Sequence, residues 1–284
     1  MSRIAYVDGA YVPHARARVS IDDRGFLFGD AIYEVWGVNG GALRDAEGHF
    51  ARLDRSLAEL RIAAPMSRAA LEIVVKEMVR RNRVDFGHIY LEISRGAAPR
   101  DHAFPDPPVA PTIVLTARRL DPRTFHARAA RGVSVISAPD IRWGRCDIKT
   151  VNLLPNALAK QAAKEVGAAE AWLVDAHGFV TEGGSSNAWI VDAQGRLRTR
   201  PLDNAILHGV TRARTIDLAR SLQIPVDEAA FTLEEVYGAR EAFLTSAVNG
   251  PMPIVAIDGR AIGDGAPGPV CMRLRDAYFG AEAG

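Results

Sequence analysis

The lysines of this chain are the first residues whose type could carry unusual chemistry. Lys and Arg together number 35, but only four are lysines, at positions 76, 149, 160 and 164. A lysine amine can form an imine with a carbonyl compound and a guanidinium cannot, so a lysine kept in an arginine-rich sequence is a candidate for amine chemistry. A bias in genome composition would explain the same count, so the bias favours this hypothesis without establishing it.

Lys149 is the strongest of these candidates because of its neighbours. It lies in IRWGRCDIKTVNLL, where apolar and aromatic residues surround a single lysine. Burial lowers the pKa of a lysine and so supplies the neutral amine that imine formation requires. An ion pair with Asp147 at a strand end would explain the same residues equally well. Lys160 and Lys164, four residues apart in an Ala-rich helical pattern, are expected on one solvated face.

TEGGSSN, residues 181–187, is a loop of small residues that holds one carboxylate, Glu182. Such a loop lets a flat ligand approach the backbone, and the carboxylate could hold a protonated ring nitrogen. An ordinary Gly-Ser turn with an acid in it fits the same residues.

LHGVTRARTIDLARSL predicts a helix that begins at Thr211, with Ile216, Ala219 and Leu222 on its inward face. The backbone amides of Val210 and Thr211 would then point out of the helix N-terminus, which is a favourable place for a phosphate dianion. Thr211 is equally well explained as an N-cap, and one residue can serve both purposes.

RGAAPRDHAFP is an irregular, proline-containing segment that brings Arg95, Arg100 and His102 within a few residues. Cations in such a loop suggest capture of a substrate carboxylate, because Arg offers a planar fork of donors. A solvated basic loop is the alternative. No His/Cys cluster has the spacing of metal ligands, and neither G-x-S-x-G nor a Walker-type loop occurs, so metal, serine-nucleophile and P-loop chemistry are not supported.

Composition limits the partners of the chain. Its 284 residues are 48% hydrophobic and 24% charged, with a formal net charge of +1. That charge predicts no strong field, so neither nucleic acid nor an anionic membrane is expected as a partner. Because no apolar run approaches the roughly 20 residues of a membrane span, and the N-terminus lacks an apolar signal region, a cytoplasmic protein is expected. Two cysteines fit that compartment.

The elements that must position these residues form an α+β pattern with two domains. In the first half we expect a hairpin around Asp8-Gly9, a helix over 49–62, a helix capped by Ser67, and strands over 88–94 and 112–116. RLDPRTF predicts a linker over 119–126, between domains 1–118 and 127–284. The second domain is expected to contain strands over 133–137, 242–246 and 253–262, helices over 152–167 and 211–222, and hairpins over 171–182 and 187–199.

Six segments together resemble the fold-type IV, or class IV, aminotransferases. They are DRGFLFGDAIYE, GHFARLDRS, HIYLEISRGAAPRDHAFP, IRWGRCDIKTVNLLPNALAKQAA, EAWLVDAHGFVTEGGSSNAWIV and AILHGVTRA. They occur in the family's order and span nearly the whole chain. The Arg-x-His loop and the RWGRCDIK run look most like the bacterial D-amino acid aminotransferases, so the resemblance implies the two-domain fold of those enzymes.

The resemblance implies pyridoxal 5'-phosphate (PLP) as the cofactor. Lys149 matches the lysine that binds it as a Schiff base, Glu182 matches the carboxylate on the ring nitrogen, and Leu207 matches the apolar residue on the ring face. Contacts with the phosphate are implied at Arg52, the Val210 and Thr211 amides, Ser246 and Ala247. The run 246–248 replaces hydroxyl residues often found there, so weaker retention of the cofactor is expected.

Tyr33, Arg100 and His102 match the substrate carboxylate trap of the D-amino acid enzymes, in which the Arg and His come from the neighbouring subunit. A homodimer with its active site at the subunit interface is therefore implied. Phe26 and Ala31 depart mildly from the pattern, which often has Tyr and Gly there.

The implied reaction is ping-pong transamination between a D-amino acid, such as D-alanine or D-glutamate, and pyruvate or 2-oxoglutarate. Transamination of branched-chain L-amino acids or (R)-amines, and an aminodeoxychorismate lyase-type reaction, share the fold and stay open. A non-catalytic protein that binds a phosphate ligand is the alternative from another functional class.

Overall fold

The computed structural model describes residues 3–280, which divide into two compact units. The first unit holds the chain up to Pro122 and the segment Ile148–Asn152, and the second holds Arg123–Asp147 and the chain from Leu153 onward. Within the described part of the chain, no helix is both long and apolar enough to cross a membrane.

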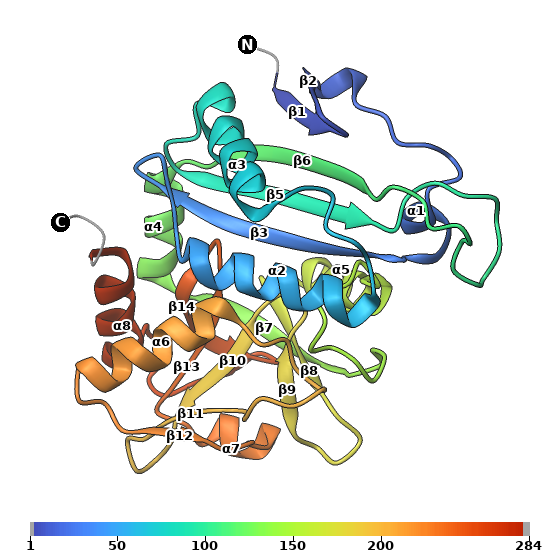
Figure 1. The fold of residues 1–284 in the computed structure, drawn as a ribbon. Coiled ribbons are helices and arrows are strands. Elements are labelled where there is room, and N and C mark those ends of the chain that lie inside the picture. Colours follow the sequence, from blue (N-terminus) through green and yellow to red (C-terminus); the bar gives the residue numbers. More distant parts are fainter. Residues whose placement is uncertain (1–2, 281–284) are drawn as a thin grey trace. The chain divides into compact units, whose positions relative to one another are not determined.

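The first unit is built on a six-stranded antiparallel sheet with strand order β2-β1-β6-β5-β3-β4 (Figure 1). The strands are β1 (Ile4–Val7), β2 (Ala10–Pro13), β3 (Ala31–Asn39), β4 (Ala42–Leu43), β5 (Gly87–Ser94) and β6 (Thr112–Arg119). Asp8 and Gly9 both have positive φ, as a two-residue hairpin turn requires. The short helices η1 (His14–Arg16) and α1 (Arg24–Phe28) lie between β2 and β3.

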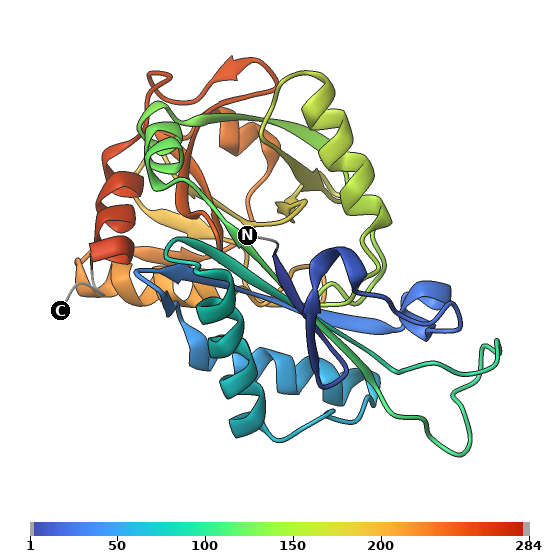
Figure 2. The same cartoon turned by 90° about the horizontal axis from the view of Figure 1, so that it is seen from above.

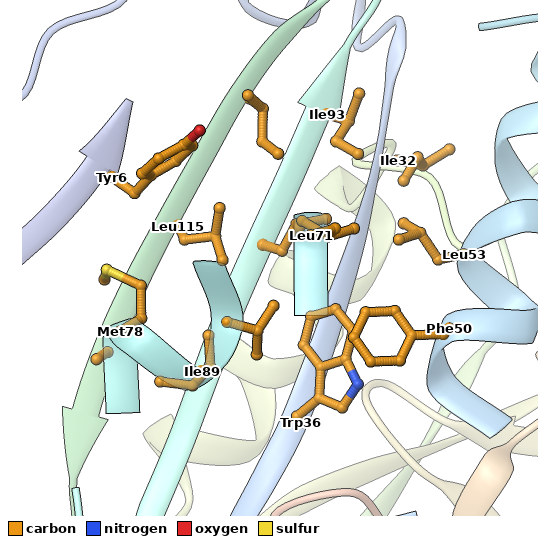
Figure 3. Packing of buried hydrophobic residues seen from close by; sticks show 14 of the residues in the cluster. Tyr6, Ile32, Trp36, Phe50, Leu53, Leu71, Met78, Ile89, Ile93 and Leu115 are labelled. Atoms are coloured by element: carbon orange, nitrogen blue, oxygen red, sulfur yellow. The ribbon is translucent and has the colours of Figure 1, made fainter. Parts of the chain in front are cut away.

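Two longer helices, α2 (Ala46–Leu60) and α3 (Arg68–Asn82), cover one face of this sheet. Alternation along the strands turns Ile32 and Trp36 of β3 and Ile89 of β5 toward them, and all three are fully buried. Figure 3 shows Trp36 facing Phe50 of α2, with ring centroids 4.9 Å apart. Ser67 caps α3 by accepting a hydrogen bond from the Ala70 amide, as predicted.

The segment 148–152 joins the first unit although the chain on both sides of it belongs to the second. It runs beside β3: the Tyr33 amide donates to the Lys149 carbonyl (2.9 Å), and the Val151 amide donates to the Ala31 carbonyl (3.2 Å). Ile148 packs into the core of this unit. The backbone of Lys149 is thereby fixed at the edge of a sheet that is distant in the sequence.

The second unit contains a nine-stranded mixed sheet of order β12-β11-β10-β13-β14-β7-β8-β9, with β15 paired to β14. Its strands are β7 (Val133–Pro139), β8 (Glu170–Val174), β9 (Val180–Gly183), β10 (Asn187–Val191), β11 (Leu197–Thr199), β12 (Val226–Glu228), β13 (Glu241–Ser246), β14 (Gly250–Ile257) and β15 (Arg260–Ala261). The helices are α4 (Pro122–Arg131), α5 (Leu154–Glu165), α6 (Val210–Ser221), α7 (Leu233–Tyr237) and α8 (Pro269–Gly280).

Two separate layers of helix pack on this second sheet. Ile216 and Ala219 of α6 and Leu274 of α8 share a core with Trp189 and Phe243, whose rings stack with centroids 5.5 Å apart. On β8, α5 packs through alanines.

The α+β class and the predicted strands, hairpins and principal helices are confirmed. Three details differ. Helix α6 begins at Val210 with Gly209 as its N-cap, so Thr211 is not a cap residue but lies inside the first turn. Strand β3 and helices α1, α4, α7 and α8 are among the elements that were not predicted, and α4 begins within the predicted linker. The division into domains at 119–126 stays a prediction.

Candidate active site

Lys149 lies on the face of the first sheet that carries Tyr33 and Tyr90, opposite the face that α2 and α3 cover. Its Nζ is 4.0 Å from the centroid of the Tyr33 ring, and Tyr33 stacks on Tyr90 with centroids 5.7 Å apart. The Tyr90 hydroxyl donates to Glu92 (2.7 Å), and burial, together with that carboxylate, raises the pKa of Tyr90. The structure therefore brings two predicted site residues, Lys149 and Tyr33, into direct contact.

Arg52 lies on the other face of the same sheet, in a buried cluster with Glu34 and His49. Its Nε and Nη2 donate to the two Glu34 oxygens at 2.6 and 2.9 Å, and His49 Nδ1 lies 2.8 Å from Glu34 Oε2. Burial acts to raise the pKa of Glu34, but the Arg52 guanidinium prevails and holds that pKa far below its usual range. The bidentate pair fixes the plane of the Arg52 guanidinium.

Arg100 and His102 lie in the β5–β6 loop, which extends beyond the ends of its strands (Figure 2). Both side chains are exposed, and both flank the Phe28 ring: the Arg100 Cζ is 5.2 Å and the His102 ring centroid 5.4 Å from its centroid. The structure therefore gathers these two predicted carboxylate ligands at one end of the first unit.

Arg24 holds this loop in place and was not identified from the sequence. It is 3% exposed and donates to the carbonyls of Asp101, His102 and Ala103 at 2.6 to 3.2 Å, and to the Asp30 carboxylate at 2.8 Å. Three successive carbonyls on one guanidinium fix the path of the backbone that carries Arg100 and His102.

Arg95, grouped with these cations in the sequence, has a structural role instead. It is buried, forms a two-point pair with Asp30 (2.7 and 2.9 Å) and donates to the carbonyls of Leu60 and Arg61. Its Cζ lies 3.5 Å from the centroid of Phe104. Arg95 is therefore neither a solvated cation nor a free carboxylate ligand, whereas Arg100 is exposed.

Glu182 of β9 is buried in a dense set of donors within the second unit. It accepts from Arg142, from Asn187 Nδ2 (3.0 Å), and from the Leu207 amide, which reaches both oxygens at 3.1 Å. Arg142 is held in turn by Asp140. These contacts fix the orientation of the carboxylate.

The N-terminus of α6 follows Leu207 and lies against Asn187. Asn187 Nδ2 also donates to the Leu207 carbonyl (3.0 Å), and a side chain at Gly209 would collide with the Asn187 Oδ1. Helix α6 has neither a side-chain cap nor an acidic residue in its first turn. The first amides of any helix have no partner within it, so this end suits an anion.

Thr211 tests whether this end fits a phosphate. Its side chain is 3% exposed, and its Oγ1 is a buried hydroxyl with no hydrogen-bond partner among the described residues. A buried, unsatisfied hydroxyl costs about 1–3 kcal/mol, and a phosphate oxygen would satisfy it. The second unit therefore fits the phosphate of PLP at the amides of Val210 and Thr211.

Ser246 and Ala247 lie where β13 turns into β14, and both are partly buried. The Ser246 hydroxyl accepts from the amide of Asn249 (3.3 Å) and from its Nδ2 (3.0 Å). Arg275 supports the turn by donating to the carbonyls of Asn249 and Pro251. The hydroxyl of Ser246 thus stabilises its own turn, and the phosphate contact predicted at this position stays a prediction.

Of the other lysines, Lys160 departs from the expected solvated face. Its Nζ donates to the Ala169 carbonyl (2.9 Å) and lies 3.2 Å from Glu170, which also accepts from Ser185 (2.7 Å). Lys164 is exposed as expected.

Comparison with known proteins gives one consistent family. The amino-transferase class IV model matches residues 31–257. A D-alanine aminotransferase of Staphylococcus epidermidis is 38% identical over 273 residues, which cover 96% of this chain and 95% of that protein. A T.th. branched-chain amino acid aminotransferase, solved with pyridoxamine 5'-phosphate, superposes with a TM-score of 0.89 at 28% identity, over 99% of this chain and 94% of that one. The 4-amino-4-deoxychorismate lyase of Pseudomonas aeruginosa superposes with a TM-score of 0.79 at 25% identity, covering 98% and 99% of the two chains.

Proposed function

We propose a D-amino acid transamination for this chain, starting from an established premise: it belongs to the class IV aminotransferases and is a PLP-dependent transaminase. The amino group of a D-amino acid such as D-alanine or D-glutamate is transferred to a 2-oxo acid such as pyruvate or 2-oxoglutarate. Relatives that are 38% identical to the chain support this choice, because they are D-alanine aminotransferases.

The single observation that carries the preference for D-amino acids is the arrangement of the β5–β6 loop. Arg100 and His102 flank one ring, Phe28, and Arg24 holds the loop backbone. A guanidinium with an imidazole N–H donor beside it suits a substrate carboxylate. Fixing the carboxylate fixes which bond of the α-carbon faces the reacting amine, and so selects the hand of the substrate.

Each unit carries its own share of the groups proposed to hold PLP. In the first unit these are Lys149, which binds the cofactor covalently through Nζ, and Arg52, which is assigned to the phosphate. In the second unit, Glu182 is assigned to the ring nitrogen, Leu207 to the ring face, and Val210, Thr211, Ser246 and Ala247 to the phosphate. When bound, PLP supplies an electron sink for the carbanion formed at the substrate α-carbon.

The remaining steps belong to residues of this chain. Arg100, His102 and Tyr33 orient the substrate carboxylate. With its amine free, Lys149 Nζ would accept the α-proton as general base and return a proton as general acid. Glu182 stays ionised, because Arg142, Asn187 and the Leu207 amide all donate to it, and it therefore holds the proton on the ring nitrogen.

We assign Arg100 and His102 to the active site of a second copy, so the working enzyme is a homodimer. Both residues are exposed in the single chain, and the first unit also exposes large apolar side chains: Val19 (50%), Ile21 (80%), Phe26 (75%) and Phe104 (45%). Exposed apolar groups of this size are typical of a protein interface. A cytoplasmic location is part of the same proposal and is supported by the free thiols of Cys146 and Cys271.

The test is an amino-donor screen with each donor supplied as separate enantiomers and with pyruvate and 2-oxoglutarate as acceptors. D-alanine or D-glutamate is expected to be preferred, and Lys149→Ala is expected to abolish turnover. Arg100→Ala should raise the KM for the D-donor, since it removes a carboxylate ligand. Transamination by Lys149→Ala, or unchanged D-alanine kinetics in Arg100→Ala, would contradict the assignment.

Transamination of branched-chain L-amino acids is the second candidate, favoured by the structural match to branched-chain aminotransferases. The same screen separates it, because L-leucine or L-valine would then replace D-alanine as the preferred donor. Release of pyruvate from aminodeoxychorismate without an amino acceptor would indicate the lyase reaction instead.

A further inference from the structure

The carboxylate of Glu182 belongs to a buried three-residue network that the sequence did not indicate. Arg142 lies between two carboxylates, donating through Nε and Nη2 to Asp140 (2.9 and 2.7 Å) and through Nη1 to Glu182. The side chains of Asp140, Arg142 and Glu182 are only 10%, 6% and 6% exposed. Their electrostatic effects are therefore poorly screened by water.

The Arg142 guanidinium makes more hydrogen bonds to Asp140 than to Glu182. Asp140 occupies two of the donors in a bidentate pair, which is the strongest geometry available to Arg and a carboxylate, and leaves Glu182 one N–H. The three formal charges sum to −1, since Arg is always protonated. The formal charges of Arg142 and Glu182 alone would sum to zero. Asp140 adds a second negative charge, so the group of three keeps a net negative charge beside the ring-nitrogen position.

The surroundings keep this arrangement in place. The Thr181 hydroxyl donates to Asp140 Oδ2 (2.7 Å), and Arg142 Nη2 also donates to the Ala205 carbonyl (2.9 Å). Burial acts to raise the pKa of Asp140, but Arg142 and Thr181 outweigh it, so that pKa is lowered and Asp140 is ionised at neutral pH. Burial raises the pKa of the nearby Cys146 to about 11, so the thiol is neutral there and adds no charge.

We propose that Asp140 and Arg142 are positioning residues that set the strength with which Glu182 holds the protonated ring nitrogen of PLP. Arg142 orients Glu182 and keeps it ionised, and Asp140 offsets the positive charge of Arg142 so that Glu182 stays a strong acceptor. This inference rests on the proposed function, because it takes Glu182 as the partner of the ring nitrogen.

The test compares the Kd of PLP with the Kd of an analogue in which a carbon atom replaces the ring nitrogen. The ratio of the two constants reports on the ring nitrogen alone, because both ligands share the aldehyde and the phosphate. Wild type is expected to prefer PLP by about tenfold or more, the size of a charge-assisted hydrogen bond. Glu182→Gln is expected to lose most of that preference.

Asp140→Asn is the informative variant. It leaves the charge of Arg142 without its main partner, which weakens Glu182 as an acceptor, so the preference for PLP is expected to fall by a factor of about three or more. Arg142→Lys keeps a cation but cannot bridge both carboxylates, and it should lower the ratio as well. Thr181→Val removes the hydrogen bond to Asp140 (2.7 Å) together with the longer contacts of the same hydroxyl with Arg142 Nη2 (3.3 Å) and the Leu173 carbonyl (3.2 Å). It leaves both charges in place, should give a smaller loss in the same direction, and serves if Asp140→Asn does not fold.

Asp192→Asn is the matched control. Asp192 is another buried aspartate of the second unit paired with an arginine, Arg196, at 2.9 Å, and its substitution should leave the ratio at the wild-type value. Wild-type ratios in both Asp140→Asn and Thr181→Val, with a collapsed ratio in Glu182→Gln, would overturn this inference and leave the proposed function intact. A wild-type protein that does not bind PLP would instead overturn the proposed function.

Discussion

Glu34 is the residue on which the charges of the Arg52 cluster depend. It is fully buried, and it is the shared acceptor for the guanidinium of Arg52 and the ring of His49. A buried cation that loses its partner is far more costly than a surface one, because water cannot replace the lost contact.

Glu34→Gln is therefore expected to lower the free energy of unfolding by about 3–5 kcal/mol, the usual cost of breaking a buried ion pair on one side. Urea denaturation of the protein without added PLP measures this directly. Glu77→Gln is the control, since Glu77 likewise pairs with two basic side chains, Arg80 and Arg81, but at the surface. A loss no larger than that of Glu77→Gln would show that Glu34 carries no buried charge.

His49 makes stability depend on pH. Burial lowers its pKa below the ordinary 6.5, so the folded protein keeps the ring neutral, with Nδ1–H donating to Glu34. The unfolded chain binds a proton below about pH 6.5, so stability is lost as the pH falls from there. His49→Gln should therefore show a smaller loss between pH 7 and pH 5 than wild type. The exposed His177→Gln should match wild type, and equal pH slopes in all three proteins would refute this account.

At this scale the sequence offered candidates for the reactive residues but none for the residues that position them. Lys149, Glu182 and Arg100 stand in recognisable motifs. Arg142 and Arg24 each pair with a nearby aspartate, Asp140 or Asp30, which by itself indicates no role in a site. They were missed because the partners that connect them to the site, Glu182 and the carbonyls of 101–103, lie 40 and 77 to 79 residues away.

Helix α6 is the element whose end should bind the cofactor phosphate. Thr211→Val replaces an unpartnered buried hydroxyl with a methyl group. The protein without cofactor should be at least as stable as wild type, since no internal hydrogen bond is lost, while the Kd for PLP should rise about fivefold to tenfold. Equilibrium dialysis and thermal denaturation measure the two effects.

Thr215→Val, one turn further along, is the control for α6. Its hydroxyl donates to the Thr211 carbonyl (2.7 Å) and is already satisfied. It should lower stability modestly without changing the Kd for PLP. Equal Kd values for both variants would show that Thr211 does not contact the phosphate.

The β5–β6 loop is the element that presents Arg100 and His102. Arg24→Gln removes donors to three carbonyls of this loop, so the KM for D-alanine is expected to rise about tenfold, with a smaller change in kcat and an unchanged Kd for PLP. Arg18→Gln is the control, because Arg18 also donates to backbone carbonyls but is exposed and outside this loop. A fall in kcat with constant KM would contradict a role in substrate positioning.

Two of the helices that were not predicted, α4 and α8, differ in how clearly the sequence indicates them. Helix α4 buries only Phe125 and Ala129, too few residues to give a helical period. Helix α8 buries positions 271, 274, 275 and 278, which is a helical spacing, but a buried arginine interrupts the apolar stripe. The Thr211 cap was wrong because Gly209, which closely approaches Asn187, begins the helix two residues earlier.

For the molecule as a whole, the proposed active site made by two copies can be tested without measuring the mass of the assembly. Lys149→Ala and Arg100→Ala subunits, unfolded together and refolded at equal concentrations, form hybrid dimers in which one of the two sites has both residues intact. About a quarter of all sites are then intact, so activity at low D-alanine should recover to about that fraction of wild type.

Each variant refolded alone is the control for the hybrid experiment. Neither variant alone contains an intact site, so unfolding and refolding should leave each at the low activity that it had before. A mixture no more active than the average of the two would show that Arg100 acts within its own subunit.

The fold class was accessible from the sequence because six motifs occur in family order across nearly the whole chain. The preference among substrates is less accessible, since it depends on which side chains a loop such as 95–105 places together. That placement is decided by contacts such as those of Arg24, which link residues far apart in the chain.

The segment 148–152 has a consequence for how the protein is made. A ribosome adds about 5–20 residues per second, so all six strands of the first sheet have been translated by Arg119, well before Lys149 is added. A nascent chain stopped between residues 119 and 149 would contain the residues of all six strands and lack Lys149. The segment 148–152, which carries Lys149, is therefore the last part of the first unit to be translated.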